Sequence, residues 1–502
     1  MATHLPSPLD ALRAPGTVKH FIGGAWVESA DGQTFETTNP ATNEPIARIA
    51  KGGEADLQRA IAAARKAFDE GPWPRMRPAE RARILRKVGD LITERAPEIA
   101  RTETLDTGLP IAQTGGAQIP RAADNFYFFA EMANHMDGRA FHNADYLNYT
   151  IQRPVGVAGL ITPWNLPFML TSWKLAPCLA SGCTAVVKPA SWTPLSNEKL
   201  AECIRDAGVP DGAYNLVYGS GETVGMGLVR SPEVQAISFT GETTTGKTIM
   251  REGAATMKRY SMELGGKSPI VVFADADYDR ALDAAIFGVY SLNGERCTAS
   301  SRCIVERSIY DRFVADLIAR VNKIRVGDPL DKATEIGALI HPTHLDRVLE
   351  YVAIGQAEGA KLVAGGGRVP GLDRGNYMQP TLFADVDNRM QIAQEEVFGP
   401  FLVAMPFDTE KEAIRLANDV KYGLAGYLWT GDVARAHRVA QRIQCGMVWV
   451  NSQNVRDLRT PFGGAKESGI GREGGDYSWE FYCEMQNIAI ALGNQHIPHF
   501  GK

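Results

Sequence analysis

The spacing of hydrophobic residues predicts helices in the first third of the chain. In residues 52–71, four apolar positions recur every three or four residues, as on one helical face: Leu57, Ile61, Ala64 and Phe68. A second helix is expected to begin at Pro78, because proline fits a first helical turn. A third is predicted over about residues 117–136. Before them, Gly–Gly and Asp–Gly turns indicate short strands, preceded by a predicted disordered tail over residues 1–16.

Apolar runs typical of strands alternate with helical segments through most of the remaining chain. The first set is VGVAGLI, CTAVVK, YNLVY and VQAISF; a second set after Ser268 is PIVVF, RCIVE, YMQPTLF and FLVAMPF. This alternation predicts mostly parallel sheets covered by helices. The predicted fold class is therefore α/β, with two Rossmann-like lobes that meet near Gly265 and Gly266.

Composition and charge narrow the class of protein. A chain of 502 residues with 44% hydrophobic and 22% charged residues is typical of a globular protein with two or three lobes. A net charge of -5 does not favour nucleic acid or an anionic membrane as a partner. No apolar run has the length of a signal sequence or a membrane span, so the seven cysteines are expected to be reduced thiols in the cytoplasm. Their spacing fits no zinc site, and no metal is expected.

Two glycine-rich junctions could bind a phosphate. YGSGETVGMG places Gly219, Gly221 and Gly225 between a strand and a helix, but the gap before the last glycine is one residue longer than in the dinucleotide fingerprint. SFTGETTTG, around Gly241, is a second such junction. The free N–H groups of a helix N-terminus could hold phosphate at either place. A simple glycine turn explains both equally well.

A carboxylate and a thiol flank the predicted junction between the lobes. Glu263 stands in MELGGKSP before one strand, and Cys297 stands in NGERCT after the next helix. Spacing alone does not bring these two residues together. Most cysteines are small core residues, and a glutamate in a turn is commonly a surface carboxylate.

Seven segments, taken in order, resemble the aldehyde dehydrogenase superfamily: ITPWNLP, KPASWTP, SFTGETTTG, MELGGKSP, NGERCTA, QEEVFGP and FGGAKESGIGREGG. The resemblance extends from about residue 20 to the end of the chain. Within the superfamily the chain is most similar to the muconate-semialdehyde dehydrogenases, through IPRAADNFYFFAEM, DYLNYTIQRPVGV, NVRDLRTPFGG and HIPHFGK.

This resemblance implies an enzyme of aromatic ring-cleavage catabolism that oxidises an acidic semialdehyde to the carboxylate with NAD or NADP. The first candidate substrate is 5-carboxymethyl-2-hydroxymuconate semialdehyde; 2-hydroxymuconate and 2-aminomuconate semialdehydes are alternatives. A broad-specificity aromatic or aliphatic aldehyde dehydrogenase is a further alternative. A catalytically idle member that acts as a structural or binding protein belongs to a different class, which the joint presence of Cys297, Glu263 and Asn165 disfavours.

The motifs of the superfamily imply catalytic roles for five residues. Cys297 would add to the aldehyde as a thiolate, which forms near neutral pH where the pKa is lowered, and hydride transfer would leave a thioester. Glu263 would be the general base for the attacking water. The Asn165 amide and the Cys297 backbone N–H would stabilise the oxyanion. Lys174 and Glu473 resemble a proton-relay pair, although a solvated lysine and glutamate explain them equally well.

The cofactor contacts are implied in the same way. Lys188 would reach the adenosine ribose, and Glu396 and Phe398 would hold the nicotinamide ribose and ring. Ser191 stands where many NAD enzymes of the superfamily have a glutamate that repels a 2′-phosphate, so NAD and NADP are both candidates. The other expected contacts are Trp164, Gly221, Gly225, Thr240, Gly241, Glu242 and Leu264.

Substrate binding and assembly also follow from the resemblance. Arg121 and Arg459 are expected to hold the carboxylate of the substrate, since a guanidinium grips a carboxylate bidentately, although each could pair locally instead. Residues 1–136 and 158–265 would form the NAD(P)-binding domain, and residues 266–475 the catalytic domain. Residues 137–157 and 476–502 would form a small β oligomerisation element, whose edge invites a partner strand in a homodimer or homotetramer.

Overall fold

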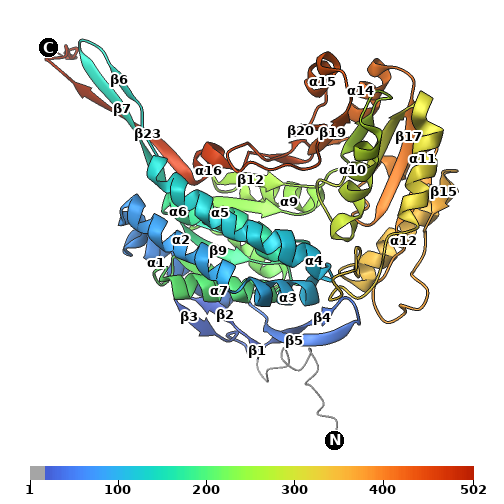
Figure 1. Ribbon diagram of the computed structural model, residues 1–502. Coiled ribbons are helices and arrows are strands. Elements are labelled where there is room, and N and C mark those ends of the chain that lie inside the picture. The colour runs from blue at the N-terminus through green and yellow to red at the C-terminus, as the bar shows by residue number, and fades with distance from the viewer. Residues whose placement is uncertain (1–16, 502) are drawn as a thin grey trace, which may run out of the picture.

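The computed structural model describes residues 17–501, so the predicted tail lies outside the described residues. Two α/β lobes are visible, and a thin β arm extends from the first of them (Figure 1). The first lobe is built on an eight-stranded sheet of order β22-β12-β11-β8-β9-β10-β2-β3, in which the strands from β12 to β10 are parallel. Its strands are β2 (His20–Ile22), β3 (Ala25–Val27), β8 (Val157–Ile161), β9 (Thr184–Lys188), β10 (Tyr214–Leu216), β11 (Ala236–Thr240), β12 (Arg259–Glu263) and β22 (Gly469–Ile470).

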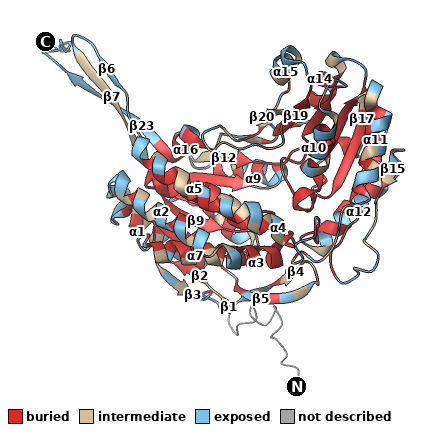
Figure 2. Ribbon diagram, viewed as in Figure 1, coloured by how far each residue is buried: buried red, intermediate tan, exposed pale blue. Residues whose placement is uncertain are grey.

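Helices cover both faces of this sheet, so alternate residues of a strand enter different cores. In β9, Ala185 and Val187 belong to the core under α2, α5, α6 and α7, whereas Val186 belongs to the core under α1 and α9. The central strands β8, β9 and β10 are accordingly buried along their whole length (Figure 2). The helices are α1 (Glu54–Asp69), α2 (Pro78–Glu94), α3 (Ala96–Thr107), α5 (Ile119–Met132), α6 (Pro167–Ser181), α7 (Leu195–Ala207), α8 (Met226–Arg230) and α9 (Thr243–Gly253).

The helices predicted from periodicity are present, with one change of length. Leu57, Ile61 and Ala64 are buried on α1, and α2 begins at Pro78. The third predicted helix is shorter than expected, because α5 lies between a π-turn at Thr114–Gln118 and a 3-10 turn at Ala133–His135. Helix α3 is not predicted from the sequence, because its buried face carries Glu103 and Asp106 among the apolar residues.

The second lobe contains a seven-stranded sheet of order β15-β16-β17-β14-β13-β19-β20, parallel except for β15 at its edge. Its strands are β13 (Pro269–Val272), β14 (Arg302–Glu306), β15 (Lys361–Ala364), β16 (Thr381–Ala384), β17 (Phe401–Phe407), β19 (Ala425–Trp429) and β20 (Met447–Val450). Its helices are α10 (Tyr278–Tyr290), α11 (Arg307–Val321), α12 (Pro342–Ala357), α14 (Glu410–Asn418) and α15 (Val433–Ala440). The α/β class with two parallel-sheet lobes is thus confirmed.

The chain crosses between the lobes more than once. It leaves the first sheet after β12 and enters the second at β13, across residues 264–268. Near its end it returns, because β22 pairs with β12 and α16 (Gly475–Tyr482) buries Trp479 and Phe481 in the first core. Outside the two main sheets, their helices and the arm lie β1 (Thr17–Val18), β4 (Thr34–Asn39), β5 (Glu44–Ala50), β18 (Tyr422–Gly423), β21 (Ala465–Lys466), η1 (Trp73–Arg75), α4 (Ile111–Gln113), η4 (Gly221–Gly225), η5 (Ser291–Gly294) and α13 (Gln391–Gln394).

The arm is a three-stranded antiparallel sheet of β6 (Ala140–His142), β7 (Tyr146–Pro154) and β23 (Cys483–Ala491). It projects away from both lobes (Figure 1), and β6 and β23 are mostly exposed while β7 is mostly half-buried (Figure 2). Met485 and Ile490 on β23 are 63% and 45% exposed, although they are apolar. Across residues 17–501, the helices are all too short or too polar to cross a membrane.

Candidate active site

Three of the predicted site residues end parallel strands of the first sheet, where open α/β sheets carry their ligands. Lys188 ends β9, Thr240 ends β11 and Glu263 ends β12. The crossing segment that follows β12 then touches the cysteine loop of the second lobe. A Cβ placed on Gly266 would lie 2.6 Å from the carbonyl oxygen of Cys297. The fold therefore brings the carboxyl end of β12 against the Cys297 loop.

A left-handed turn after α10 leads to Cys297. Leu292 and Asn293 have φ angles of 54° and 56°, which non-glycine residues keep only where their surroundings hold them. The Asn293 side chain provides such an anchor: Oδ1 accepts from the Gly337 N–H at 2.7 Å, and Nδ2 donates to two backbone carbonyls. Cys297 and Cys445 are half-buried, and the other cysteines are buried. The turn thus leaves the Cys297 side chain partly accessible.

The Glu263 carboxyl is buried, with 5% of the residue exposed, and its Oε1 has no hydrogen-bond partner among the described residues. Burial raises the pKa of Glu263 to about 8, and the charge of Glu473 acts in the same direction. Lys174, Arg472 and Arg456 oppose this rise in pKa. A carboxyl that titrates near pH 8 and keeps a free oxygen is suited to accept a proton from water.

The protein groups around Cys297 raise the pKa of its thiol to about 12, in contrast to the lowered pKa expected from the sequence. Burial is the largest cause, followed by the carboxylates of Glu263 and Glu396. The Arg296 guanidinium opposes them. A bound oxidised nicotinamide ring would add positive charge near the sulfur, which would favour the thiolate.

The Asn165 side chain contacts the loop that carries Cys297. It belongs to the loop between β8 and α6, is 5% exposed, and donates through Nδ2 to the carbonyl oxygen of Glu295 at 2.9 Å. Glu295 is two residues before Cys297, so this bond ties the Asn165 loop to the cysteine loop. An amide nitrogen has two hydrogens, and the second is available to an oxygen bound at the cysteine.

Lys174 and Glu473 form a buried ion pair, with Nζ 2.8 Å from Oε1. The same Oε1 accepts from the hydroxyls of Ser238 and Ser261, each at 3.1 Å, while Oε2 has no partner within the described chain. Ser261 is two residues before Glu263 on β12, so the pair adjoins the buried carboxyl. These contacts exclude the alternative in which Lys174 and Glu473 are solvated surface residues.

Two arginines lie against Trp173, the residue before Lys174. They are Arg121, which was predicted, and Arg456, which was not. The guanidinium carbons of Arg121 and Arg456 lie 5.7 Å and 5.1 Å from the ring centroid of Trp173. Arg459, which the sequence suggested, is exposed and is held by Asp457. The structure thus brings Arg456 to Arg121 and leaves Arg459 in solvent. VRDLR contains both arginines, and no sequence pattern distinguishes the inward-facing one.

The charge of Arg456 acts on Glu263, Glu473 and Cys297. Burial lowers the pKa of Arg456 to about 10, as does Arg121, while Glu263, Glu473 and Cys297 oppose the shift. Across residues 17–501, neither Arg121 nor Arg456 forms an ion pair with an acidic side chain. Two half-buried cations without a protein anion provide a place for an anionic ligand.

The predicted adenosine contacts lie at the ends of β9 and β10. Lys188 is 5% exposed, and burial lowers its pKa to about 8. Ser191 is half-buried and donates through Oγ to the carbonyl oxygen of Gly219 at 3.0 Å. Ser220 caps the short η4 turn, which contains Gly221 and Gly225, by accepting from the Thr223 N–H at 2.9 Å.

The predicted pyrophosphate contacts surround the first turn of α9. Thr240 ends β11 and has a buried hydroxyl without a partner in the described part of the chain, Gly241 follows it, and Glu242 is the N-cap residue. A cavity of about 280 Å³ opens here. Its lining joins this helix end to the second lobe through Glu242, Thr243, Lys247, Arg347, Tyr422 and Glu396.

The predicted nicotinamide contacts complete this cleft. Glu396 Oε1 accepts from the Gly266 N–H at 2.8 Å, and burial raises the pKa of Glu396 to about 7. Phe398, whose φ is 61°, has its ring 5.2 Å from that of Trp164, edge to face. His344 Nε2 contacts the Phe398 carbonyl oxygen at 2.8 Å. Sequence analysis missed His344 because it did not predict α12. Leu264, also predicted, is buried in the core that lies under α1 and α9.

The cleft fits a dinucleotide: it offers a helix N-terminus, an unpaired buried hydroxyl and an empty cavity across the carboxyl ends of parallel strands. In the described range, no group of three or more histidine, cysteine, aspartate or glutamate residues could hold a metal ion.

These features are those of an aldehyde-oxidising site, and the chain belongs to the aldehyde dehydrogenase family, whose profile matches residues 26–488. It is 52% identical to the 5-carboxymethyl-2-hydroxymuconate semialdehyde dehydrogenase of Escherichia coli over 92% of this chain and 98% of that one. Identity to the 2-hydroxymuconic semialdehyde dehydrogenase of Pseudomonas sp. (strain CF600) is 46%, over 95% and 99% of the two chains.

Solved structures show the same fold. HpcC from Thermus thermophilus superposes with a TM-score of 0.96 and 50% identity, over 98% of this chain and 97% of that one. The NAD+ complex of an aldehyde dehydrogenase from Bacillus cereus gives a TM-score of 0.95 and 40% identity, over 98% and 99% of the chains. The resemblance inferred from the sequence motifs is therefore confirmed.

Proposed function

We propose that this chain oxidises an acidic semialdehyde of aromatic ring cleavage to the carboxylate with NAD or NADP, and that 5-carboxymethyl-2-hydroxymuconate semialdehyde is the first candidate. The observation that carries the proposal is the pair Arg121 and Arg456: they meet at Trp173 without a protein anion in the described chain, and Arg456 interacts electrostatically with Cys297 and Glu263. A neutral aldehyde would leave both cations unpaired, at a desolvation cost. The names of the two relatives support the same substrate class.

Cys297 begins the proposed reaction as the thiolate: its proton passes to solvent, its sulfur adds to the carbonyl carbon, and a thiohemiacetal forms. The aldehyde oxygen becomes an oxyanion, and the free hydrogen of the Asn165 amide and the Cys297 backbone N–H donate to it. Because the bond from Asn165 to the Glu295 carbonyl already fixes the amide, little reorganisation is needed.

Glu263 completes the reaction by accepting a proton from the water that attacks the thioester, and the C–S bond then breaks to release the carboxylate and the Cys297 thiol. Its unpaired Oε1 and its pKa near 8 suit this role. Glu473 and Lys174, reached through Ser261, would pass the proton onward from the buried carboxyl.

The dinucleotide would be held by Lys188 and Ser191 at the adenosine, by the α9 N-terminus at the pyrophosphate, and by Glu396 and Phe398 at the nicotinamide. When bound, its oxidised ring supplies the hydride acceptor.

Ser191 donates to Gly219, so its hydroxyl neither repels a 2′-phosphate nor has a hydrogen to spare for one. We therefore expect both cofactors to be used, with kcat/KM values within about 100-fold of each other. Parallel assays with NAD and NADP test this, and a larger preference would show that Ser191 does not decide cofactor use.

Arg456→Gln is expected to lower kcat/KM for the acidic semialdehyde about 100-fold more than for propanal, because the substrate carboxylate loses a charged bidentate partner. Arg459→Gln is the matched control, since Arg459 is exposed and paired with Asp457. Steady-state assays of both variants on both substrates give the comparison.

A selective loss of kcat/KM for the acidic semialdehyde in the Arg459 variant, with none in the Arg456 variant, would show that Arg459 binds the substrate carboxylate, as the sequence predicted. Equal losses on propanal and the acidic semialdehyde in both variants would favour a broad-specificity enzyme. No oxidation of any aldehyde by the unmodified chain would favour a structural or binding role.

We also propose that the predicted domains divide the function between them. Residues 1–136 and 158–265 would bind the dinucleotide, residues 266–475 would supply the nucleophile, and the arm with residues 137–157 and 476–502 would join protomers. The exposed apolar residues Met485 and Ile490 on β23 support such an interface. The molar mass in solution should then be that of a homodimer or homotetramer, and a monomer at micromolar concentration would contradict it.

A further inference from the structure

Arg296, the residue immediately before Cys297, is a buried cation without an acidic partner. Only 8% of it is exposed. Its Nε donates to Thr298 Oγ1 and its Nη1 to Ser291 Oγ, both at 3.0 Å. No ion pair involving Arg296 occurs within residues 17–501. Its charge is thus met by two neutral hydroxyls.

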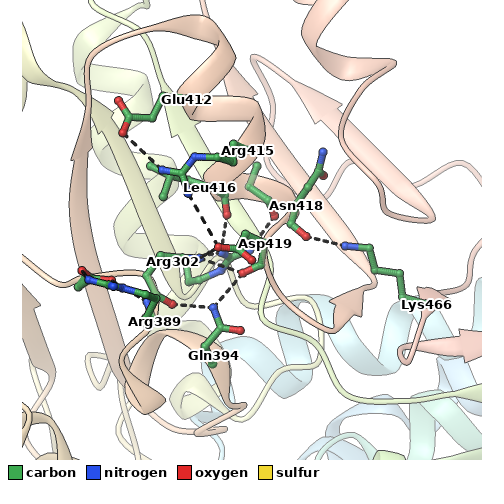
Figure 3. Close-up of polar contacts among 12 residues, drawn as sticks. Arg302, Arg389, Gln394, Glu412, Arg415, Leu416, Asn418, Asp419 and Lys466 are labelled. Atoms are coloured by element: carbon green, nitrogen blue, oxygen red, sulfur yellow. Dashed lines mark hydrogen bonds and ion pairs between the residues drawn. The ribbon is translucent and has the colours of Figure 1, made fainter.

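A second buried arginine, Arg302, shows how this fold stabilises a guanidinium that serves only structure. Arg302 is fully buried and donates to Asn388 Oδ1 and to the backbone carbonyls of Lys267, Leu416 and Ala417, at 2.8–2.9 Å. Figure 3 shows Arg302 and Leu416 from this group. Two of those carbonyls end α14, where the helix dipole is negative. Four acceptors around Arg302 replace the water that burial removes, and Arg296 has no comparable set.

Arg296 therefore retains donors for an anion. A guanidinium has five N–H groups, and the described chain engages two of them at Arg296. The guanidinium carbon lies 5.7 Å from the ring centroid of Phe287, which is 56% exposed, so the group lies near the surface of the lobe. The Arg296 charge also acts on Cys297, whose pKa it lowers, so the guanidinium is within electrostatic reach of the nucleophile.

The chemistry of the first candidate substrate matches this position. In 5-carboxymethyl-2-hydroxymuconate semialdehyde, the carboxymethyl group is attached to the carbon next to the aldehyde carbon. Its carboxylate must therefore lie close to the nucleophile when Cys297 attacks. The 2-hydroxymuconate semialdehyde has the same skeleton without this second carboxylate. A cation adjacent to Cys297 distinguishes these two substrates.

We propose that Arg296 binds the second carboxylate of the substrate, so that the enzyme selects dicarboxylated over monocarboxylated semialdehydes. The inference rests on the proposed function, in which Arg121 and Arg456 hold the first carboxylate. It goes beyond that function by assigning a separate group to the second carboxylate. The alternative is that Arg296 only braces the cysteine loop between Ser291 and Thr298.

The test compares kcat/KM of Arg296→Gln and Arg296→Lys on three aldehydes: 5-carboxymethyl-2-hydroxymuconate semialdehyde, 2-hydroxymuconate semialdehyde and propanal. Arg296→Gln should lower the ratio of the first to the second value about 30-fold, because only the first substrate loses a charged partner. Arg296→Lys keeps the charge without the bidentate fork, and should restore part of the ratio.

An equal loss on all three aldehydes would overturn the inference and assign Arg296 to bracing, since a misplaced sulfur harms every substrate alike. If Arg296→Gln does not fold, as judged by thermal unfolding, the ratio is measured on Arg296→Lys, for which an unchanged ratio overturns the inference. Failure of the proposed function has a different result: Arg456→Gln would leave the preference for either acidic substrate over propanal intact.

Discussion

Replacing Cys297 with alanine is expected to lower kcat for aldehyde oxidation by about 10⁴-fold or more, because the covalent intermediate of the proposed reaction forms on this sulfur. The Asn165 amide would still polarise the aldehyde, but an aldehyde without an added nucleophile is a poor hydride donor. Reduced nicotinamide formation, followed by absorbance at saturating aldehyde, measures the loss.

Cys445→Ala is the matched control for this variant. Cys445 is the other half-buried cysteine, and its thiol contacts the Met447 carbonyl oxygen rather than a site residue. Its replacement should leave kcat within about twofold. If Cys297→Ala kept more than about a tenth of the activity, covalent catalysis by this thiol would be excluded.

Glu263→Gln is expected to lower kcat about 10²- to 10⁴-fold, the usual contribution of a general base. The loss should fall on thioester hydrolysis, so a first turnover of about one equivalent of reduced nicotinamide per subunit should remain as a burst. Rapid mixing with aldehyde and NAD measures both phases. A variant that lost the burst and the steady state together would place Glu263 in the attack of Cys297 instead.

The pH profile provides a second test of Glu263. Because the pKa of Glu263 is raised to about 8, its basic form accumulates as pH rises, and kcat limited by hydrolysis should increase up to about pH 8. Lys174→Met removes a charge that lowers this pKa, so the limb should move to higher pH. Glu263→Gln should abolish the limb.

The raised pKa of Glu263 also makes the stability of the fold depend on pH. The folded chain holds the Glu263 proton up to a higher pH than the unfolded chain does, so ionisation opposes folding. The stability contributed by the neutral carboxyl is therefore lost as pH rises from the ordinary glutamate range to about 8. Glu263→Gln, which cannot ionise, should lose less stability over this interval.

The sequence was sufficient for the elements whose burial follows a simple period. Leu57, Ile61 and Ala64 mark the buried face of α1, and the apolar run of β9 reflects helices on both sides of its sheet. Helix α3 escaped prediction because it buries Glu103 and Asp106, which satisfy part of their hydrogen bonding across the fold at Phe168 and Leu195. Such partners are distant in the chain and leave no local pattern.

The site also contains residues that the sequence predicts and residues whose role depends on the fold. Cys297, Glu263 and Asn165 stand in motifs that resemble a known family, so the sequence could name them. The direction of each arginine in VRDLR depends on neighbours from other elements: Trp173 on α6 lies beside Arg456, whereas Asp457 holds Arg459 in solvent. The pKa values of Cys297 and Glu263 likewise depend on burial and on charges from both lobes, which only the folded chain reveals.

The most direct test of the account is the mass of the covalent intermediate. Glu263→Gln is mixed with NAD and aldehyde, quenched with acid within the burst phase, and digested for mass spectrometry. The account predicts that the peptide containing Cys297 gains the mass of the acyl group derived from the aldehyde. An unmodified Cys297 peptide at full burst, or an acyl group on another cysteine, would contradict it.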